Sequence, residues 1–195
     1  MNYLAHVALA HNSDASRIGN FLGDFAKGTH ESLLEKWPTE LVQGFIMHRA
    51  IDSLTDSHPT FREAKQLIDP NRRRLAGIAI DIIYDHFLSR HWNLFYQQER
   101  SLFINQFYQS LEQHPQWWIG EFAHAYPYLK SENWLECYVS KDGIKLTLDR
   151  ISKRNRKWTL PLAECYQDFE RHYSEFEKLF LILYPELIER ARNIL

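Results

Sequence analysis

The sequence has few of the residues that mark β-hairpins, disulfide frameworks or zinc sites. It contains seven glycines and two cysteines in 195 residues, and we find no β-hairpin signal in it. Cys137 and Cys165 are far apart and fit no zinc-binding spacing. We therefore expect a reduced, cytoplasmic protein in which a metal ion would be bound by His, Asp or Glu.

The chain also lacks a strong net charge and a long apolar run. Its formal charge of −2 gives no overall attraction to nucleic acid or to a membrane surface. No apolar stretch reaches the ~18 residues of a membrane span. The opening MNYLAHVALAH has no basic region and no small-residue cleavage site, so we expect no signal peptide.

What the sequence does contain is helical periodicity. Apolar residues make up 45% of the chain and aromatic residues 14%, which indicates a folded domain with a sizeable core. Ile18, Phe21, Leu22 and Phe25 follow the i, i+3, i+4, i+7 spacing of one helix face. The prediction is a single all-α domain over residues 1–195, with roughly seven to nine helices.

Capping residues and prolines give the expected helix boundaries. Ser13 or Asp14 would cap the helix that contains the first stripe, and Pro59 would end the second helix. Asp69 and Pro70 would open a long helix to about residue 92. Further helices are expected at about 61–68, 101–113, 131–139, 143–154 and 161–183, the last of them ended by Pro185.

Three polar groups interrupt the apolar run LAGIAIDIIYDHFL within the expected long helix. Asp81 and Asp85 lie one turn apart on one face, and His86 points about a quarter-turn away. A buried carboxylate costs several kcal/mol unless it is paired, hydrogen-bonded or bound to a metal. These side chains therefore need partners inside the fold.

The preceding helix has a second pair of this kind. His48 and Asp52 have an i, i+4 spacing and continue the apolar stripe begun by Leu41 and Phe45. Carboxylates with imidazole suit Mn²⁺, Mg²⁺ or Fe, which predicts a metal site and, as one choice among several, a hydrolase. A phosphohydrolase of a nucleotide or another small phosphodiester would use the same site. The alternative from a different class is a non-catalytic helical binding protein with structural polar groups, for example carboxylates paired with Arg49 or Arg90.

Two basic clusters stand out in a chain of nearly balanced charge. The first is Arg72, Arg73 and Arg74, and the second is Lys153, Arg154, Arg156 and Lys157. Each is either a solvated surface or a docking site for an acidic partner or a phosphate.

Several stretches together resemble a known family. They are MNYLAH at the start, GNFLGDFAKG at 19–28, HRAIDSLTDSHP at 48–59 and RRRLAGIAIDIIYDHFLSRHW at 72–92. The chain resembles the bacterial acyl carrier protein phosphodiesterases, also called ACP hydrolases. The resemblance continues more loosely through SENWLECYV and HYSEFEKLFLILYPEL, so it covers nearly the whole chain.

The resemblance implies hydrolysis of the phosphodiester that joins 4′-phosphopantetheine to a serine of holo-acyl carrier protein. It also implies an HD-domain-like fold and a divalent metal, with Mn²⁺ expected before Mg²⁺, Co²⁺ or Fe²⁺. The adjacent His-Asp pair typical of HD enzymes is reversed here, as Asp85-His86. The acidic carrier protein would dock on Arg72, Arg73 and Arg74.

The resemblance and the helix geometry together give the expected site residues. The expected metal ligands are Asp24, His48, Asp52 and Asp85. Asp85, His86 and Asp81 are expected to be catalytic, and His6, Arg49 and Arg90 to contact the substrate. His6 could equally be a further ligand or a structural residue. In this interpretation Asp85→Ala abolishes activity and leaves the fold intact.

Overall fold

The structure, a computed structural model, describes residues 1–153 and 157–194, and every regular element in these ranges is a helix. The prediction of an all-α fold is confirmed. Seven to nine helices were too few, because the described residues form thirteen α-helices and four 3₁₀ helices. The α-helices are α1 (Tyr3–Leu9), α2 (Asp14–Leu22), α3 (His30–Leu34), α4 (Thr39–Ser57), α5 (Pro59–Leu67), α6 (Ala76–Arg90), α7 (Trp92–Phe95), α8 (Arg100–Gln113), α9 (Phe122–Ser131), α10 (Trp134–Cys137), α11 (Lys141–Ser152), α12 (Cys165–Arg171) and α13 (Tyr173–Ala191). The 3₁₀ helices are η1 (Gly23–Phe25), η2 (Pro70–Leu75), η3 (Pro115–Trp117) and η4 (Lys157–Glu164).

The larger count arises mainly from short helices that the sequence did not predict, α1, α3, α7 and α9, and in one place from the division of an expected long helix. The helix expected from residue 70 onward begins as η2 and becomes α-helical only at Ala76. The segment 161–183 is divided at His172, between α12 and α13. Pro185 does not end α13, contrary to expectation, because Leu183 and Leu187 are buried on either side of it and hold the helix in place.

The expected caps are present at two helix starts. The Ser13 hydroxyl accepts a hydrogen bond from the N–H of Ser16 at 3.2 Å, which satisfies one free donor of α2. The Asp69 carboxylate accepts from the N–H of Asn71 at 2.9 Å, directly before the proline that opens η2. The cap residues therefore mark these two boundaries correctly.

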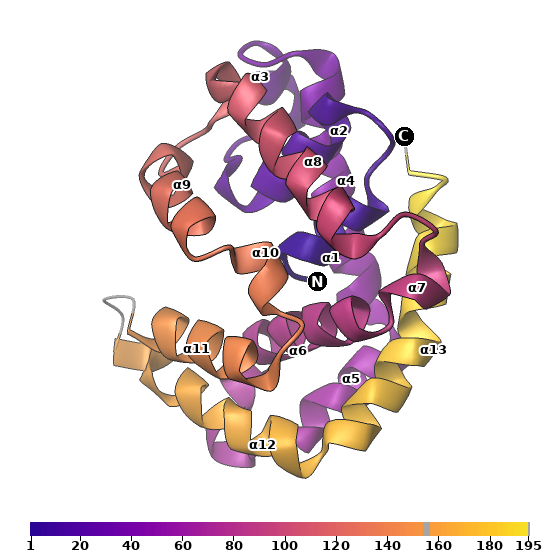
Figure 1. Cartoon of the computed structure of the whole chain (residues 1–195), viewed down its shortest axis with the longest axis vertical. Helices are drawn as coiled ribbons and strands as arrows, with labels where there is room; N and C mark the ends of the chain where they lie inside the picture. Colours follow the sequence, from indigo (N-terminus) through magenta and orange to yellow (C-terminus); the bar gives the residue numbers. More distant parts are fainter. Residues whose placement is uncertain (154–156, 195) are drawn as a thin grey trace.

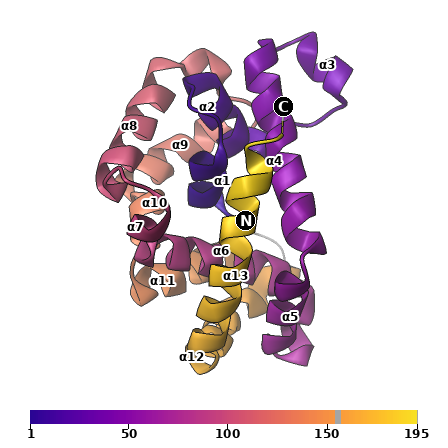
Figure 2. The same cartoon turned by 90° about the vertical axis from the view of Figure 1, so that its right-hand side faces the viewer.

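The short helix α1 lies near the middle of the molecule. Figure 1 shows α2, α4 and α8 toward one end and α5, α11 and α12 toward the other. Helices α1 and α6 lie between these groups, and Figure 2 shows the same order from the side. Since α1 packs against α2, α6 and α13, it connects the two halves of the chain.

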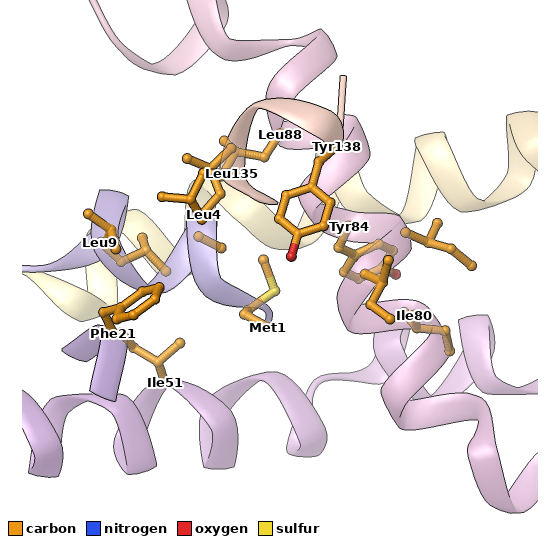
Figure 3. Packing of buried hydrophobic residues seen from close by; sticks show 14 of the residues in the cluster. Met1, Leu4, Leu9, Phe21, Ile51, Ile80, Tyr84, Leu88, Leu135 and Tyr138 are labelled. Atoms are coloured by element: carbon orange, nitrogen blue, oxygen red, sulfur yellow. The ribbon is translucent and has the colours of Figure 1, made fainter. Parts of the chain in front are cut away.

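One continuous core includes the N-terminal residue itself. Met1 is buried, and Figure 3 shows its side chain among Leu4 of α1, Ile80 of α6 and Tyr138, which follows α10. Burial of such side chains stabilises the fold by about 1.5–3 kcal/mol each. Within 1–153 and 157–194, no helix combines the length and apolar character that a membrane crossing requires.

The packing of α2 on α4 depends on two glycines. A Cβ atom on Gly19 would lie 2.3 Å from the carbonyl oxygen of Leu41, and one on Gly44 would lie 2.8 Å from the Cα of Gly19. Both neighbours are backbone atoms, so they cannot move away cheaply. This close approach brings the C-terminal end of α2, and the residues that follow it, against α4.

We expect Gly44→Ala to destabilise the protein by about 1–3 kcal/mol, because the added methyl group forces the two helices apart. The measurement is the free energy of unfolding in urea. Gly77→Ala in α6 is the matched control, since its Cβ would meet only the Cε of Lys65 at 4.0 Å. If Gly44→Ala and the control were equally stable, this explanation of the packing of α2 on α4 would be wrong.

Candidate metal centre

Two histidines from different helices are stacked at the centre of the molecule. The rings of His6 in α1 and His48 in α4 are 3.8 Å apart between centroids and inclined by 21°. The Nε2 atom of His6 is 3.1 Å from one oxygen of Asp52, and the Nε2 atom of His48 is 3.2 Å from the other. The three side chains offer ligand atoms that all lie within 4.8 Å of one another.

Asn20 determines how both rings are oriented. Its buried side-chain oxygen accepts from Nδ1–H of His6 at 3.0 Å, and its backbone carbonyl accepts from Nδ1–H of His48 at 2.8 Å. With Nδ1 protonated, a neutral imidazole has its lone pair on Nε2. Asn20 therefore directs the Nε2 atoms of both histidines toward Asp52.

Asp24 reaches the cluster from the turn that follows α2. Its carboxylate oxygen is 3.3 Å from Nε2 of His48, while 67% of its side chain is exposed. The preceding Gly23 permits this approach, because a Cβ there would lie 2.2 Å from Cγ of the His48 ring. Asp24 is thus the member of the cluster that is most accessible to a substrate.

The cluster is rich in electron pairs and short of protons. Nε2 of His48 faces oxygens of Asp24 and Asp52, and Nε2 of His6 faces Asp52 and the carbonyl oxygen of Met1 at 3.1 Å. Apart from the imidazoles themselves, these groups can only accept. A proton or a metal ion between them would relieve the repulsion, so the donor set fits a divalent cation.

The pKa values reflect this environment. Burial lowers the pKa of His48, but hydrogen bonds and charge from Asp24 and Asp52 outweigh burial and raise it to about 9. Burial lowers the pKa of His6 to about 4, and the neighbouring His48 charge acts in the same direction. Partial burial raises the pKa of Asp52, yet both histidines and the Met1 ammonium bring it below its usual range. Asp52 is therefore ionised at neutral pH.

Asp81 lies at the edge of the cluster, joined to it by the amino group of Met1. This ammonium group is 2.9 Å from an oxygen of Asp81 and 3.4 Å from one of Asp52. Burial lowers its pKa, but the two carboxylates raise it to about 10. For Asp81, burial raises the pKa and the ammonium group partly offsets this effect.

Asp85 has a different role from the one expected. One carboxylate oxygen accepts from the N–H of Leu4 at 2.8 Å and the other from the N–H of Ala5 at 3.1 Å. It is fully buried and satisfies the free donors at the start of α1. Both oxygens bind the helix terminus, and Asp85 is not among the residues whose ligand atoms come together in the cluster, so this geometry does not support the metal-ligand and catalytic roles expected for it.

His86 is also engaged in the core. Its Nδ1 donates to the carbonyl oxygen of Tyr138 at 2.8 Å, and its Nε2 is 3.0 Å from the hydroxyl of Tyr173. The ring packs edge-on against Phe87 and Phe169. The structure does not bring His86 to the cluster, and the catalytic role expected for it has no support here.

The arginines expected to contact substrate lie apart from the paired carboxylates. Arg49 donates to the carbonyl oxygens of Ala26 at 2.9 Å and Gly28 at 3.2 Å, so it fixes the loop after η1. Arg90 is exposed at the last residue of α6. The structure gives neither arginine a contact with the ligand atoms of the cluster.

One arginine of the first basic cluster, Arg72, is neutralised within the fold. Arg72 donates to both oxygens of Asp168, at 2.9 and 3.0 Å, and to Glu164 at 3.1 Å. Arg73 and Arg74 donate to backbone carbonyl groups. Docking on this cluster is therefore weakened as a hypothesis, since Arg72 already has two carboxylate partners. In the second cluster, Arg154 and Arg156 lie outside the described residues.

Sequence reasoning missed Asn20, although it lies inside the quoted GNFLGDFAKG motif. The available signal was its spacing, since Asn20 lies four residues before Asp24, as His48 lies four before Asp52. The structure brings together Asp24, His48 and Asp52, as expected, and adds His6 as an equal member.

A cavity of about 480 Å³ opens beside this cluster. Its lining includes the carboxylates of Asp24 and Asp81 together with Ile78, Ile82 and Ile151. A pocket of this size that combines carboxylates with apolar side chains is suited to a small molecule or to an extended part of a larger one.

An all-α domain that places two histidines and two carboxylates beside a cavity has the features of a hydrolase site. The model of the acyl carrier protein phosphodiesterase family matches residues 1–187, and the chain belongs to this family. None of the solved structures compared with the chain matches it.

Similar proteins cover nearly the full length of the chain. A protein named acyl carrier protein phosphodiesterase from Enterobacter sp. (strain 638) is 38% identical over 198 residues, covering 99% of this chain and 98% of the relative. One of the same name from Photorhabdus laumondii is 36% identical, covering 99% and 96%. Another, from Escherichia coli O6:H1, is 38% identical, covering 98% and 97%.

We expect Asp85→Ala to destabilise the fold by about 1–3 kcal/mol, because it leaves two buried N–H groups of α1 without an acceptor. This outcome is the opposite of the one that the sequence suggested. The measurement is urea unfolding in the absence of metal. Ser89→Ala, one turn further along α6, is the control, since the Ser89 hydroxyl only donates to the carbonyl oxygen of Asp85. If Asp85→Ala were as stable as the wild type, Asp85 would not act as the cap of α1.

Proposed function

We propose that this protein hydrolyses the phosphodiester that joins 4′-phosphopantetheine to the serine of holo-acyl carrier protein. The products would be apo-acyl carrier protein and 4′-phosphopantetheine. The observation that carries the proposal is the family relation over residues 1–187, together with relatives that bear this name over nearly their full length. The cluster of His6, His48 and Asp52 gives the proposal a chemical basis.

We further propose that the reaction needs a divalent metal, with Mn²⁺ the expected ion. His6, His48 and Asp52 would hold it, with Asp24 as a fourth ligand, because mixed imidazole and carboxylate donors suit such ions. When bound, the ion lowers the pKa of a coordinated water and withdraws charge from phosphoryl oxygens.

The two carboxylates that line the cavity have complementary environments. Ionised Asp24, whose pKa is lowered chiefly by its hydrogen bond with His48, can orient a water molecule by accepting its proton in a hydrogen bond. Burial raises the pKa of Asp81, and the Met1 ammonium group, 2.9 Å from its carboxylate, partly offsets this effect. We assign to Asp81, together with the ammonium group bound to it, the delivery of a proton to the departing serine oxygen.

The test is mass spectrometry of holo-acyl carrier protein incubated with the enzyme and Mn²⁺. The proposal requires loss of the 4′-phosphopantetheine mass from the carrier protein and its appearance as a free product. Release of pantetheine without its phosphate would place the cleavage at a different bond. An unchanged carrier protein at high enzyme concentration would refute the proposal.

Asp52→Asn should abolish both turnover and stabilisation by Mn²⁺, because it removes the carboxylate that faces both histidines. A ligand at about 100 times its Kd stabilises the native state by about 2.7 kcal/mol, and this gain should disappear. The measurement is thermal unfolding with and without Mn²⁺. Asp56→Asn is the matched control on the same helix, since Asp56 pairs with Lys65 at 2.8 Å. A variant Asp52→Asn that keeps the full gain would exclude Asp52 as a ligand.

Asn20→Ala should weaken Mn²⁺ binding by about 10–100-fold, the usual effect of removing a group that orients a metal-bound histidine. Asn20→Asp retains an oxygen acceptor for Nδ1–H of His6 and should restore most of the affinity. The measurement is a calorimetric Mn²⁺ titration, with circular dichroism to confirm the fold. Equal losses in both variants would mean that Asn20 acts through packing alone.

A further inference from the structure

A second cavity of about 520 Å³ adjoins the one beside the candidate metal centre. The two share Tyr3, Trp134 and Arg150 as lining residues, so they lie on either side of these side chains, and we refer to the two cavities together as the groove. The second cavity is mainly apolar and also borders Phe25 and Tyr128. In Figure 1, α10, which carries Trp134, lies beside the N-terminus and α11, which carries Arg150, lies below it.

The dividing side chains form a connected group. Arg150 lies over the indole ring of Trp134 at 5.4 Å, and the ring of Trp134 is 6.1 Å from that of Tyr3. The carboxylate of Glu132 pairs with the Arg150 guanidinium at 2.8 Å and accepts from the Trp134 indole N–H at 2.7 Å. This carboxylate therefore holds a cation and a broad aromatic face at the middle of the groove.

The first cavity of the groove has room for no more than about one turn of a folded segment of a carrier protein. One turn of an α-helix with its side chains, 10–12 Å wide and 5.4 Å long, occupies roughly 400–600 Å³. A single turn would therefore fill the first cavity of about 480 Å³. An extended, flexible chain fits this shape better, and the serine of the carrier protein would stay at the rim.

The lining of the first cavity combines the kinds of side chain that the substrate requires. The carboxylates of Asp24 and Asp81, where the phosphodiester would react, share this cavity with the branched side chains of Ile78, Ile82 and Ile151. Pantetheine is an uncharged chain in which a dimethyl group lies next to the phosphate and two amides follow. Branched aliphatic side chains suit the dimethyl group, and a guanidinium beside an aromatic face suits the amides.

We propose that the groove binds the pantetheine arm of the substrate, and that Arg150 and Trp134 are its specificity-determining contacts. This inference rests on the proposed function and adds to it the part of the substrate that is recognised. In this proposal the pantetheine arm lies inside the groove, and the folded part of the carrier protein contacts the enzyme surface outside the groove.

The experiment compares calorimetric binding of 4′-phosphopantetheine with that of methyl phosphate, which has no arm, to the Mn²⁺-loaded protein. The wild type should prefer 4′-phosphopantetheine by at least about tenfold. Arg150→Gln should reduce this preference by about tenfold or more, since hydrogen bonds from a charged group are worth that much. Ile151→Trp should reduce it as well, by filling the first cavity. The control is Leu146→Trp, an exposed position on the same helix that lines neither cavity, and it should keep the wild-type preference.

The outcomes separate this inference from the proposed function. If the wild type cleaves holo-acyl carrier protein but does not prefer 4′-phosphopantetheine, the groove assignment is wrong and the activity stands. An unchanged preference in Arg150→Gln and Ile151→Trp would also overturn it. If holo-acyl carrier protein is not cleaved, yet the preference exists and is lost in the two variants, the groove assignment stands and the proposed reaction fails.

Discussion

The position of α1 depends on two hydrogen bonds from its first turn to Asp85. A helix of seven residues is too short to be stable alone, and its free N–H groups are costly when buried. The Asp85 carboxylate accepts two of them and fixes α1 against α6. Through this contact, His6 reaches the candidate metal centre and Tyr3 reaches the groove. A buried carboxylate that holds a helix terminus thus decides whether the site can form.

The polar groups of α6 show that one buried helix face can satisfy its charges in different ways. Asp85 is satisfied by a helix terminus, Asp81 by an ammonium group, and His86 by a carbonyl oxygen and a hydroxyl. Each arrangement meets the requirement that a buried polar group be paired. Only Asp81 also lines the cavity. Burial of a charged residue is therefore evidence that the residue has a partner. The type of partner decides whether the residue stabilises the fold or can take part in a reaction.

The sequence predicted the fold class and part of the candidate site for definite physical reasons. The 3.6-residue period and the Ser13 cap are local signals, and they gave the all-α class and the start of α2 correctly. His48 and Asp52 were predicted to point inward together, because their spacing depends only on the helix that contains both. The partners of Asp85 and Arg72 lie 80 or more residues away in sequence. Periodicity could therefore predict the helix face on which a side chain lies, but not the residues that it contacts. Asn20 was missed because half of its role belongs to a backbone carbonyl group, which has no signature in the sequence.

The candidate ligands and the side chains that divide the groove come from different parts of the chain. The candidate ligands come from residues 6–52, where the family motifs are dense, and the dividing group comes mainly from residues 132–150. Metal ligands must keep fixed positions to within a few tenths of an ångström, whereas an aromatic and cationic wall can contact a flexible chain in several ways. Changes in the second part of the chain can therefore alter recognition of the arm without disturbing the ligand geometry. Since α1 contributes His6 to the candidate ligands and Tyr3 to the dividing group, its attachment to Asp85 couples these two parts of the proposed site.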